Sequence, residues 1–120
     1  MRIISKKKLR DFWNRPGCEA AQGALKAWYD NVKSADWKHP ADVRGTYGSA
    51  DFVSRKVVFN VGGNKYRLIA VIDYEGHKVF VRFVLTHKEY DEGRWKEDTF
   101  GDDWIGRQAW PAKRRRRRRR

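Results

Sequence analysis

The stretch that decides the fold reads Val57-Val58-Phe59-Asn60-Val61-Gly62-Gly63-Asn64-Lys65-Tyr66-Arg67-Leu68-Ile69-Ala70-Val71. Its β-branched and aromatic residues suit a pleated, half-buried surface. Gly62 and Gly63 both tolerate a positive φ, which a tight two-residue hairpin loop requires. The stretch therefore predicts two antiparallel strands joined by a turn at the two glycines.

Alternation along the strands predicts which side chains share a face of the sheet. Tyr66, Leu68, Ala70 and Ile72 fall on one face, and Arg67 falls on the other. A turn near residues 75–77 precedes a third strand over about residues 78–85. On that strand Val79, Val81, Phe83 and Leu85 are expected to share one face, and Phe80, Arg82, Val84 and Thr86 the opposite one.

The third strand runs into Thr86-His87-Lys88-Glu89, which has the pattern of a helix capping box. Thr86 would be the N-cap, His87 and Lys88 would occupy the first turn, and Tyr90 would follow. Free N–H groups at a helix N-terminus attract phosphate. The alternative is a simple cap on a surface helix, because capping boxes are common.

The N-terminal part of the chain predicts helices that cover this sheet. Ile3 and Ile4 indicate a short strand at a sheet edge, and helices are expected over residues 6–14 and 19–34, separated by Pro16-Gly17. The second helix carries an apolar stripe of Ala21, Leu25, Trp28, Val32 and Ala35. Residues 36–53 are expected to form a long irregular connection, held to the core by Trp37, Tyr47 and Phe52. The whole pattern predicts an α+β domain: two N-terminal helices packed on one face of a small, curved, mainly antiparallel sheet, followed by a short C-terminal helix.

Composition narrows the function. The net charge is +13, of which the seven C-terminal arginines supply seven and leave +6, so an anionic partner is expected: nucleic acid or an acidic protein. Cys18 is the single cysteine, and the three histidines lack zinc-ligand spacing, so neither a disulfide, a metal site nor a cofactor is expected. There is no signal-peptide pattern and no apolar run of membrane-spanning length, which predicts a cytoplasmic protein that does not contact the membrane.

The residues around the predicted helix start suit metal-independent RNA cleavage. The 2′-OH of RNA attacks the adjacent phosphate when a base takes its proton, and cations stabilise the charge that develops. His87 is the acid/base candidate, because histidine changes charge near neutral pH. Lys88, Arg67 and Arg82 are candidate phosphate clamps, while Tyr90 would stack on a base or share in proton transfer. Two alternative interpretations of these basic residues remain open. They could form an ordinary RNA-binding surface, and Arg67 could be a structural ion-pair partner of Asp73 or Glu75.

Two motifs resemble the HigB toxin family of the RelE/ParE toxin superfamily. They are residues 59–67, with the double glycine and Arg67, and residues 81–91, with Thr86-His87-Lys88-Glu89-Tyr90; the likeness covers roughly residues 1–96. The resemblance implies a RelE-like fold and the toxin half of a type II toxin–antitoxin pair. Such a toxin is a ribosome-dependent, metal-independent mRNA endonuclease acting in the 30S A site. It also implies a HigA-like antitoxin with a helix-turn-helix domain, and contact with operator DNA only through the complex.

Carried over to this chain, the resemblance assigns catalysis to His87, Tyr90, Arg82 and Lys88. It assigns RNA binding to Arg67, Lys65 and Asn64, although Asn64 and Asn60 also suit a role in holding the turn. The toxin domain is expected over residues 1–96, an extension without assigned role over 97–113, and a disordered polyarginine tail over 114–120. A gyrase-directed toxin of the ParE kind and a module that binds nucleic acid without cutting it are the rival functions.

Overall fold

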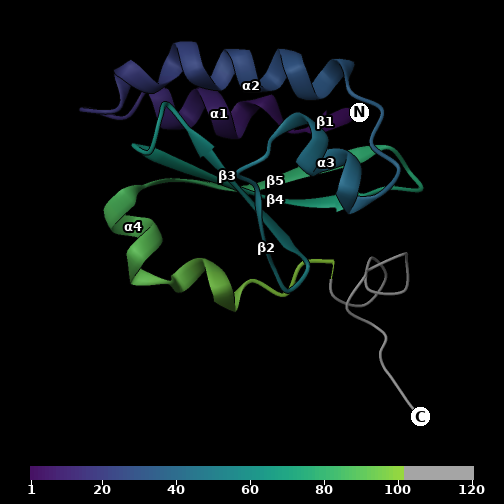
Figure 1. Cartoon of the computed structure of the whole chain (residues 1–120). Coiled ribbons are helices and arrows are strands. Elements are labelled where there is room, and N and C mark those ends of the chain that lie inside the picture. The colour runs from purple at the N-terminus through teal and green to yellow at the C-terminus, as the bar shows by residue number, and fades with distance from the viewer. Residues whose placement is uncertain (102–120) are drawn as a thin grey trace.

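The computed structural model describes residues 1–101, and in this part of the chain two helices precede most of the sheet (Figure 1). The strands are β1 (Arg2–Ile4), β2 (Asp51–Val53), β3 (Lys56–Val61), β4 (Tyr66–Asp73) and β5 (Lys78–Thr86). The helices are α1 (Lys6–Trp13), α2 (Gln22–Ser34), α3 (Pro40–Thr46) and α4 (His87–Glu92), with 3-10 turns η1 (Glu19–Ala21) and η2 (Arg94–Glu97). The predicted α+β class is confirmed.

The strands form one five-stranded sheet in the order β1-β5-β4-β3-β2. The edge strand β1 runs parallel to β5, whereas the other neighbours are antiparallel, so the sheet is mixed and mostly antiparallel. Val61 pairs with Tyr66, so the β3–β4 loop contains four residues rather than the expected two. Both glycines nevertheless adopt positive φ, 64° at Gly62 and 67° at Gly63, as their sequence predicted.

Helices α1 and α2 lie side by side over one face of the sheet (Figure 1). The stripe on α2 is buried at Leu25, Trp28 and Val32, and α1 adds Leu9 and Phe12. The opposing strand residues include Tyr66, Leu68, Ala70 and Ile72, which confirms the face assigned to β4. Trp28 and Phe59 meet edge to face, with ring centroids 5.5 Å apart.

A β-bulge changes the alternation along β5. Val81 pairs with Ala70 and Phe83 with Ile69, which leaves Arg82 as the extra residue. Beyond the bulge Val84 faces the helices, whereas Phe83 packs on the opposite face with Ile69. The expected faces of Phe83, Leu85 and Val84 are therefore wrong, because alternation is inverted wherever one strand carries an additional residue.

The second face of the sheet is covered by the chain that follows α4. Trp95 is buried against Val58 and Ile69. Farther on, Asp98 lies beside Arg82, and the Phe100 ring packs on Phe80 with centroids 5.0 Å apart. Residues 94–100 therefore cross this face of the sheet and cover part of it.

Two short elements lie inside the expected irregular connection. Helix α3 starts with Pro40, and the Asp42 carboxylate accepts hydrogen bonds from the backbone N–H groups of Lys38 (2.8 Å) and His39 (3.1 Å). Strand β2 has three residues and forms a hairpin with β3. Both elements are too short to display a clear hydrophobic period. Trp37 and Tyr47 do pack on Phe59, as predicted.

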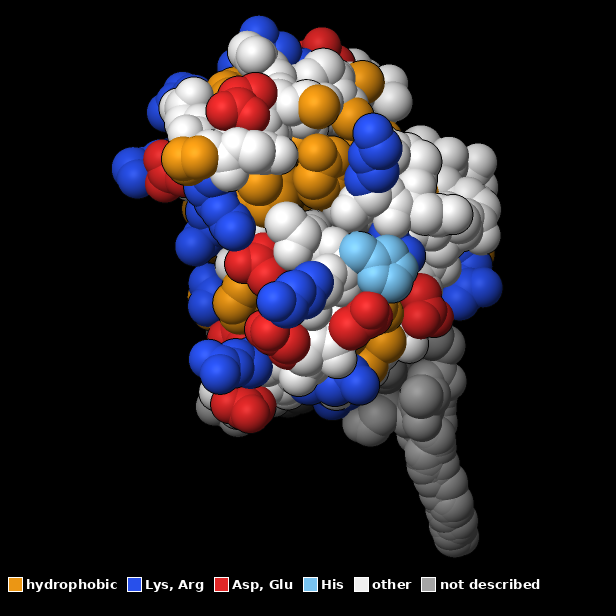
Figure 2. All heavy atoms as spheres, turned by 90° about the vertical axis from the view of Figure 1, so that its left-hand side faces the viewer, with side chains coloured by type: hydrophobic (Ala, Val, Ile, Leu, Met, Phe, Trp, Pro, Cys, Tyr) orange, Lys and Arg blue, Asp and Glu red, His pale blue; other side chains and the backbone are white. Residues whose placement is uncertain are grey.

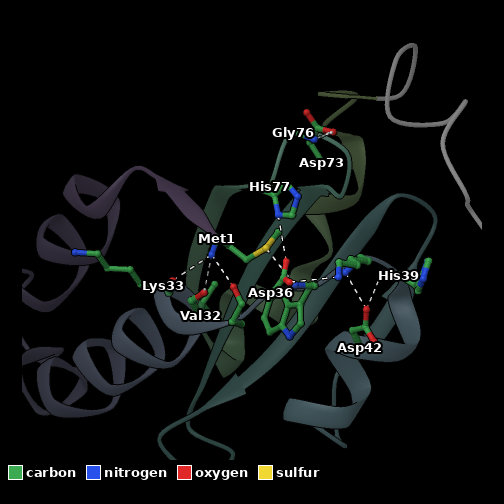
Figure 3. Close-up of polar contacts among 12 residues, drawn as sticks. Met1, Val32, Lys33, Asp36, His39, Asp42, Asp73, Gly76 and His77 are labelled. Atoms are coloured by element: carbon green, nitrogen blue, oxygen red, sulfur yellow. Dashed lines mark hydrogen bonds and ion pairs between the residues drawn. The ribbon is translucent and has the colours of Figure 1, made fainter.

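Figure 3 shows the polar contacts at the end of the molecule that carries α3 and the β4–β5 turn. The Met1 amino group donates to the carbonyls of Val32, Lys33 and Ala35 at the C-terminal end of α2, the shortest contact being 2.8 Å. A positive group is favourable there because the helix dipole is negative at its C-terminus. The His77 Nδ1 lies 3.4 Å from a carboxylate oxygen of Asp36. His77 is therefore engaged in holding this end together.

Candidate active site

The β3–β4 turn and the start of α4 lie next to each other at one end of the sheet. The antiparallel register pairs Tyr66 with Thr86. The turn residue Lys65 and the helix residue His87 therefore lie just beyond this pair, at the same end of the two neighbouring strands. Arg67 pairs with Leu85 one step inward. Two segments separated by about twenty residues are thus joined by strand register into one surface.

The predicted cap holds the helix start in place. The Thr86 hydroxyl accepts a hydrogen bond from the Glu89 N–H at 3.2 Å, and the Glu89 carboxylate accepts one from the Thr86 N–H at 3.0 Å. This reciprocal pair confirms the capping box. At the other end Gly93 takes a left-handed conformation with φ 78° and ends the helix. His87 and Lys88 are both exposed in the first turn.

An acidic partner orients His87. The imidazole Nδ1 lies 3.0 Å from a carboxylate oxygen of Asp91, one helical turn later. With Nδ1 engaged, Nε2 is the ring nitrogen left for an incoming group. Asp91 had no role in the sequence-based assignment, although its i,i+4 spacing from His87 was a readable signal.

A cation–aromatic stack stands beside the histidine. The Arg67 guanidinium lies 5.3 Å from the centroid of the Tyr90 ring, which in turn stacks on Trp95 at 5.2 Å with an interplanar angle of 11°. Arg67 also donates to the backbone carbonyls of Asn64 (3.0 Å) and Tyr66 (3.2 Å), and the Trp95 indole donates to the Tyr90 carbonyl. Arg67 thus holds the turn and Tyr90 together, rather than pairing with Asp73 or Glu75.

Arg82 is placed apart from this group. Its guanidinium forms a two-pronged ion pair with Asp98, at 2.8 and 3.2 Å, and lies over the Phe100 ring. The buried Lys56 donates to the Asp98 backbone carbonyl. The hydrogen bond from Arg82, which outweighs burial, holds the pKa of the Asp98 carboxyl below its usual range. Arg82 therefore already has an anionic partner within the chain.

A second ion pair braces α4 against the helical layer. Arg15, after α1, donates to both carboxylate oxygens of Glu89, at 3.1 and 3.3 Å. Burial tends to raise the pKa of Glu89, but hydrogen bonds from Arg15 and Thr86, with the Arg15 charge, leave that pKa lowered. Arg15 and Arg82 also line a hollow of about 250 Å³ between α1 and β5. The sequence offered no signal for Arg15, because its partner lies 74 residues away.

Six of the seven predicted site residues therefore gather at this end of the sheet. They are His87, Lys88 and Tyr90 from α4, and Asn64, Lys65 and Arg67 from the β3–β4 turn and β4. Figure 2 shows this side of the molecule, where basic side chains surround an apolar patch and acidic side chains lie beside a histidine. Within residues 1–101 no group of three or more histidine, cysteine or acidic side chains is arranged to hold a metal ion. No helix in the same range is long and apolar enough to cross a membrane.

The chain has a helix-covered mixed sheet with His87, Lys88, Tyr90 and Arg67 at one end, and its sequence is that of a RelE-like toxin. The chain belongs to the HigB toxin family. The sequence model of that family, described as the RelE-like toxic component of a toxin–antitoxin system, matches residues 21–93 of this chain. The chain is 32% identical over 94 residues to the mRNA interferase toxin HigB of Escherichia coli K12, covering 76% of this chain and 88% of that relative. It is 30% identical over 95 residues to the mRNA interferase HigB of Escherichia coli O6:H1, covering 77% and 90%. Membership of a toxin–antitoxin family implies an antitoxin partner.

Proposed function

We propose that this chain is an mRNA interferase: an endoribonuclease toxin that cuts translated messenger RNA on the ribosome without a metal ion. The observation that carries the proposal is the His87–Asp91 pair, which lies beside the Arg67–Tyr90 stack across the junction of the β3–β4 turn and α4. An oriented imidazole next to fixed cations is what attack by a 2′-OH on its own phosphate requires. The names of the relatives, mRNA interferases, point the same way.

The proposed chemistry needs one base, one acid and cationic support. A base removes the 2′-OH proton, the oxygen attacks phosphorus, the bond to the 5′ oxygen breaks, and an acid returns a proton to that leaving oxygen. The products are a 2′,3′-cyclic phosphate and a 5′-hydroxyl. His87 acts as one of the two proton-transfer groups and Tyr90 is proposed as the other. Lys88 and Arg67 stabilise the charge on the phosphorane.

Tyr90 is better suited to proton transfer than to stacking on a base. Its ring is already stacked on Trp95, and Arg67 lies over it. A nucleobase would have to displace one of these partners before it could stack there. The hydroxyl, by contrast, has no partner among the hydrogen bonds of the described chain, so it remains available to a substrate.

The cations, rather than the helix dipole, supply most of the attraction for phosphate. Helix α4 has only six residues, so its dipole is short, and Glu89 sits in its first turn. Lys88, Lys65 and Arg67 are the charged groups that RNA meets first. Arg82 would contribute only if the RNA phosphate replaced Asp98 on its guanidinium. We therefore propose a supporting role for Arg82, behind the group at the end of the sheet.

The proposal includes the setting in which the toxin works. We infer a cytoplasmic protein that acts in the 30S A site, is neutralised by a HigA-like antitoxin and reaches operator DNA only through that complex. The toxin domain is proposed to comprise residues 1–96. Residues 97–101 belong to the proposed extension and pack on the second face of the sheet through Asp98 and Phe100. The remainder of that extension and the polyarginine tail lie outside the described residues.

Primer extension on a defined message in a reconstituted translation system tests the function. Cuts at in-frame positions that require ribosomes and occur at substoichiometric toxin would support the A-site nuclease. Intact message in both conditions would contradict it and favour a gyrase-directed or purely binding toxin. Cleavage of free RNA at equal rate would retain the nuclease but remove the ribosome requirement.

A further inference from the structure

Two cationic side chains meet the same acidic residue on the second face of the sheet. Arg82, at the bulge of β5, holds the Asp98 carboxylate in a two-pronged ion pair, with nitrogen–oxygen distances of 2.8 and 3.2 Å. Lys56, the first residue of β3, donates to the Asp98 backbone carbonyl. Strands β3 and β5 flank β4 in the sheet, so Asp98 joins cations from both sides of that strand. Residues 98–100 are called the strap below.

Lys56 occupies an unusual position for a lysine. Its residue is only 4% exposed, and it is the one charged residue in the buried class among residues 1–101. A buried ammonium group is costly unless an acceptor or an opposite charge compensates it. The strap supplies both, through the Asp98 carbonyl and the nearby Asp98 charge. If the strap moved away, Lys56 and Arg82 would each lose an anionic neighbour.

The strap is held to the sheet by side chains rather than by strand pairing. In the described chain its three residues belong to neither a helix nor a strand. Its N–H groups bond locally, from Asp98 to the Trp95 carbonyl and from Phe100 to the Asp98 carboxylate, both at 3.3 Å. The Phe100 ring packs on Phe80 and lies 4.2 Å from the Arg82 guanidinium. Such a segment can detach locally while every strand of the sheet keeps its hydrogen bonds.

The Asp98 carboxylate lies where an RNA phosphate would fit. Carboxylate and phosphate both present oxygens that a guanidinium binds in the same two-pronged geometry. The position is also on the path of an RNA strand that leaves the candidate active site. Lys56 pairs with Val71, four residues along β4 from Arg67, which corresponds to about 13 Å along the strand. A strand of RNA held at Arg67 would therefore meet the two cations farther along the same face.

We propose that Arg82 and Lys56 form a second phosphate site for the RNA strand, and that the Asp98 carboxylate occupies this site in the free protein as an internal competitor. The inference rests on the proposed function for its ligand, and it adds a site and the contact that restrains it. RNA gains the site only when the strap moves aside, so the strap lowers the affinity of the free chain for RNA. The sequence model of the family matches residues 21–93, which end before the strap, so family membership does not imply this restraint.

Asp98→Asn is the discriminating variant, because it keeps the size of the side chain and removes the charge that Arg82 binds. The matched control is Glu97→Gln, which removes one negative charge from the exposed neighbouring residue. The probe is a single-stranded RNA with 2′-O-methyl groups, which cannot be cut by 2′-OH attack, and fluorescence anisotropy measures its affinity. With an open state populated at about 10%, Asp98→Asn should bind about tenfold more tightly than the unsubstituted chain, and Glu97→Gln within about twofold of it.

Loss of stability cannot imitate this result. A partly unfolded variant would bind RNA more weakly, whereas the expected change is a gain, and thermal unfolding verifies that each variant is folded at the assay temperature. Arg82→Gln shows whether the gain passes through the site. In the Arg82→Gln background, Asp98→Asn should increase affinity no more than Glu97→Gln does. A tenfold gain that persists without Arg82 would overturn the inference, because the effect would then be one of overall charge.

Amide exchange gives a second, independent readout. Binding of the same RNA should accelerate exchange at the Asp98 and Phe100 amides of the unsubstituted chain, since the strap has to move aside. Unchanged or slower exchange there, equal affinities of Asp98→Asn and Glu97→Gln, or no measurable binding by any variant would each overturn the inference. Failure of ribosome-dependent cleavage, with the gain of Asp98→Asn in RNA binding retained, would refute only the proposed function.

Discussion

At the scale of single residues, His87 is the group on which catalysis is proposed to depend. His87→Ala should reduce ribosome-dependent cleavage by about 100-fold or more, the usual contribution of a general acid or base. Asp91→Asn should cost only about two- to fivefold, because the His87–Asp91 pair is more than half exposed and such pairs contribute little. Single-turnover cleavage of a ribosome-bound message measures both. Equal cleavage rates for His87→Ala and the unsubstituted chain would contradict the proposed role of His87 in proton transfer.

Tyr90 allows its hydroxyl to be separated from its ring. Tyr90→Phe keeps the stack on Trp95 and the contact with Arg67, so the fold should be retained while cleavage falls by about 100-fold if the hydroxyl transfers a proton. Tyr90→Ala should lower both cleavage and stability, since it also removes the stacked ring. Thermal unfolding alongside the cleavage assay distinguishes them. Full activity of Tyr90→Phe would restrict Tyr90 to a packing role.

At the scale of elements, α4 is held by its cap and by the Arg15 brace. Thr86→Ala should destabilise the chain by about 1 kcal/mol through loss of the cap. Glu89→Gln keeps a capping side chain but removes the charge that Arg15 binds, so about 0.5–1 kcal/mol is expected. Urea unfolding measures both, and Lys7→Gln, which breaks an exposed pair within α1, serves as the control. Identical midpoints for Thr86→Ala and the control would contradict the role of the cap.

The same brace predicts a pH dependence. The pKa of Glu89 is lowered in the folded chain, so its ionised form stabilises the fold above the ordinary range of carboxyl groups. That contribution is lost as the pH falls through the lowered folded-state pKa. The difference in stability between the unsubstituted chain and Glu89→Gln should therefore be present at neutral pH and vanish in acid. A difference that grows on acidification would have the wrong sign.

At the scale of the whole molecule, Asp98 fastens residues after α4 to the second face of the sheet. Asp98→Asn removes the charge that Arg82 and nearby Lys56 face, and Lys56 is buried. A loss of about 2 kcal/mol is expected, because uncompensated charge in a covered site is costly. Asp91→Asn, an exposed change, should stay within about 0.5 kcal/mol. Denaturant unfolding compares the two, and equal effects would mean that Asp98 is not an anchor.

Cleavage should also be indifferent to chelation. The proposed acid, base and cationic groups are all side chains of this chain, so EDTA at levels that leave ribosomes intact should not change the rate of cutting by the toxin. Loss of cleavage that returns on adding a divalent ion, with ribosome integrity verified separately, would overturn the metal-free mechanism.

Local sequence patterns predicted most of the helices and strands of this protein. The alternation in residues 57–71, the apolar stripe of α2 and the capping box at Thr86 each act within a few residues, so they are readable without knowledge of distant contacts. They correctly predicted the main strands, both N-terminal helices and the start of α4. The capping box also predicted that His87, Lys88 and Tyr90 lie in the helix that follows Thr86, and the structure has all three in α4.

Other features depended on partners remote in the chain. The bulge at Arg82 follows from pairing with β4, and it alone moved Phe83 and Val84 to the faces opposite those expected. The Arg82–Asp98 and Arg15–Glu89 pairs join segments whose separation leaves no periodic trace. Local periodicity thus determined the elements and the chemistry available to this protein. Tertiary packing alone decided which charged side chains are already paired and which charged side chains lie at the candidate site. The reason is that strand register and ion pairing are set by contacts between distant residues.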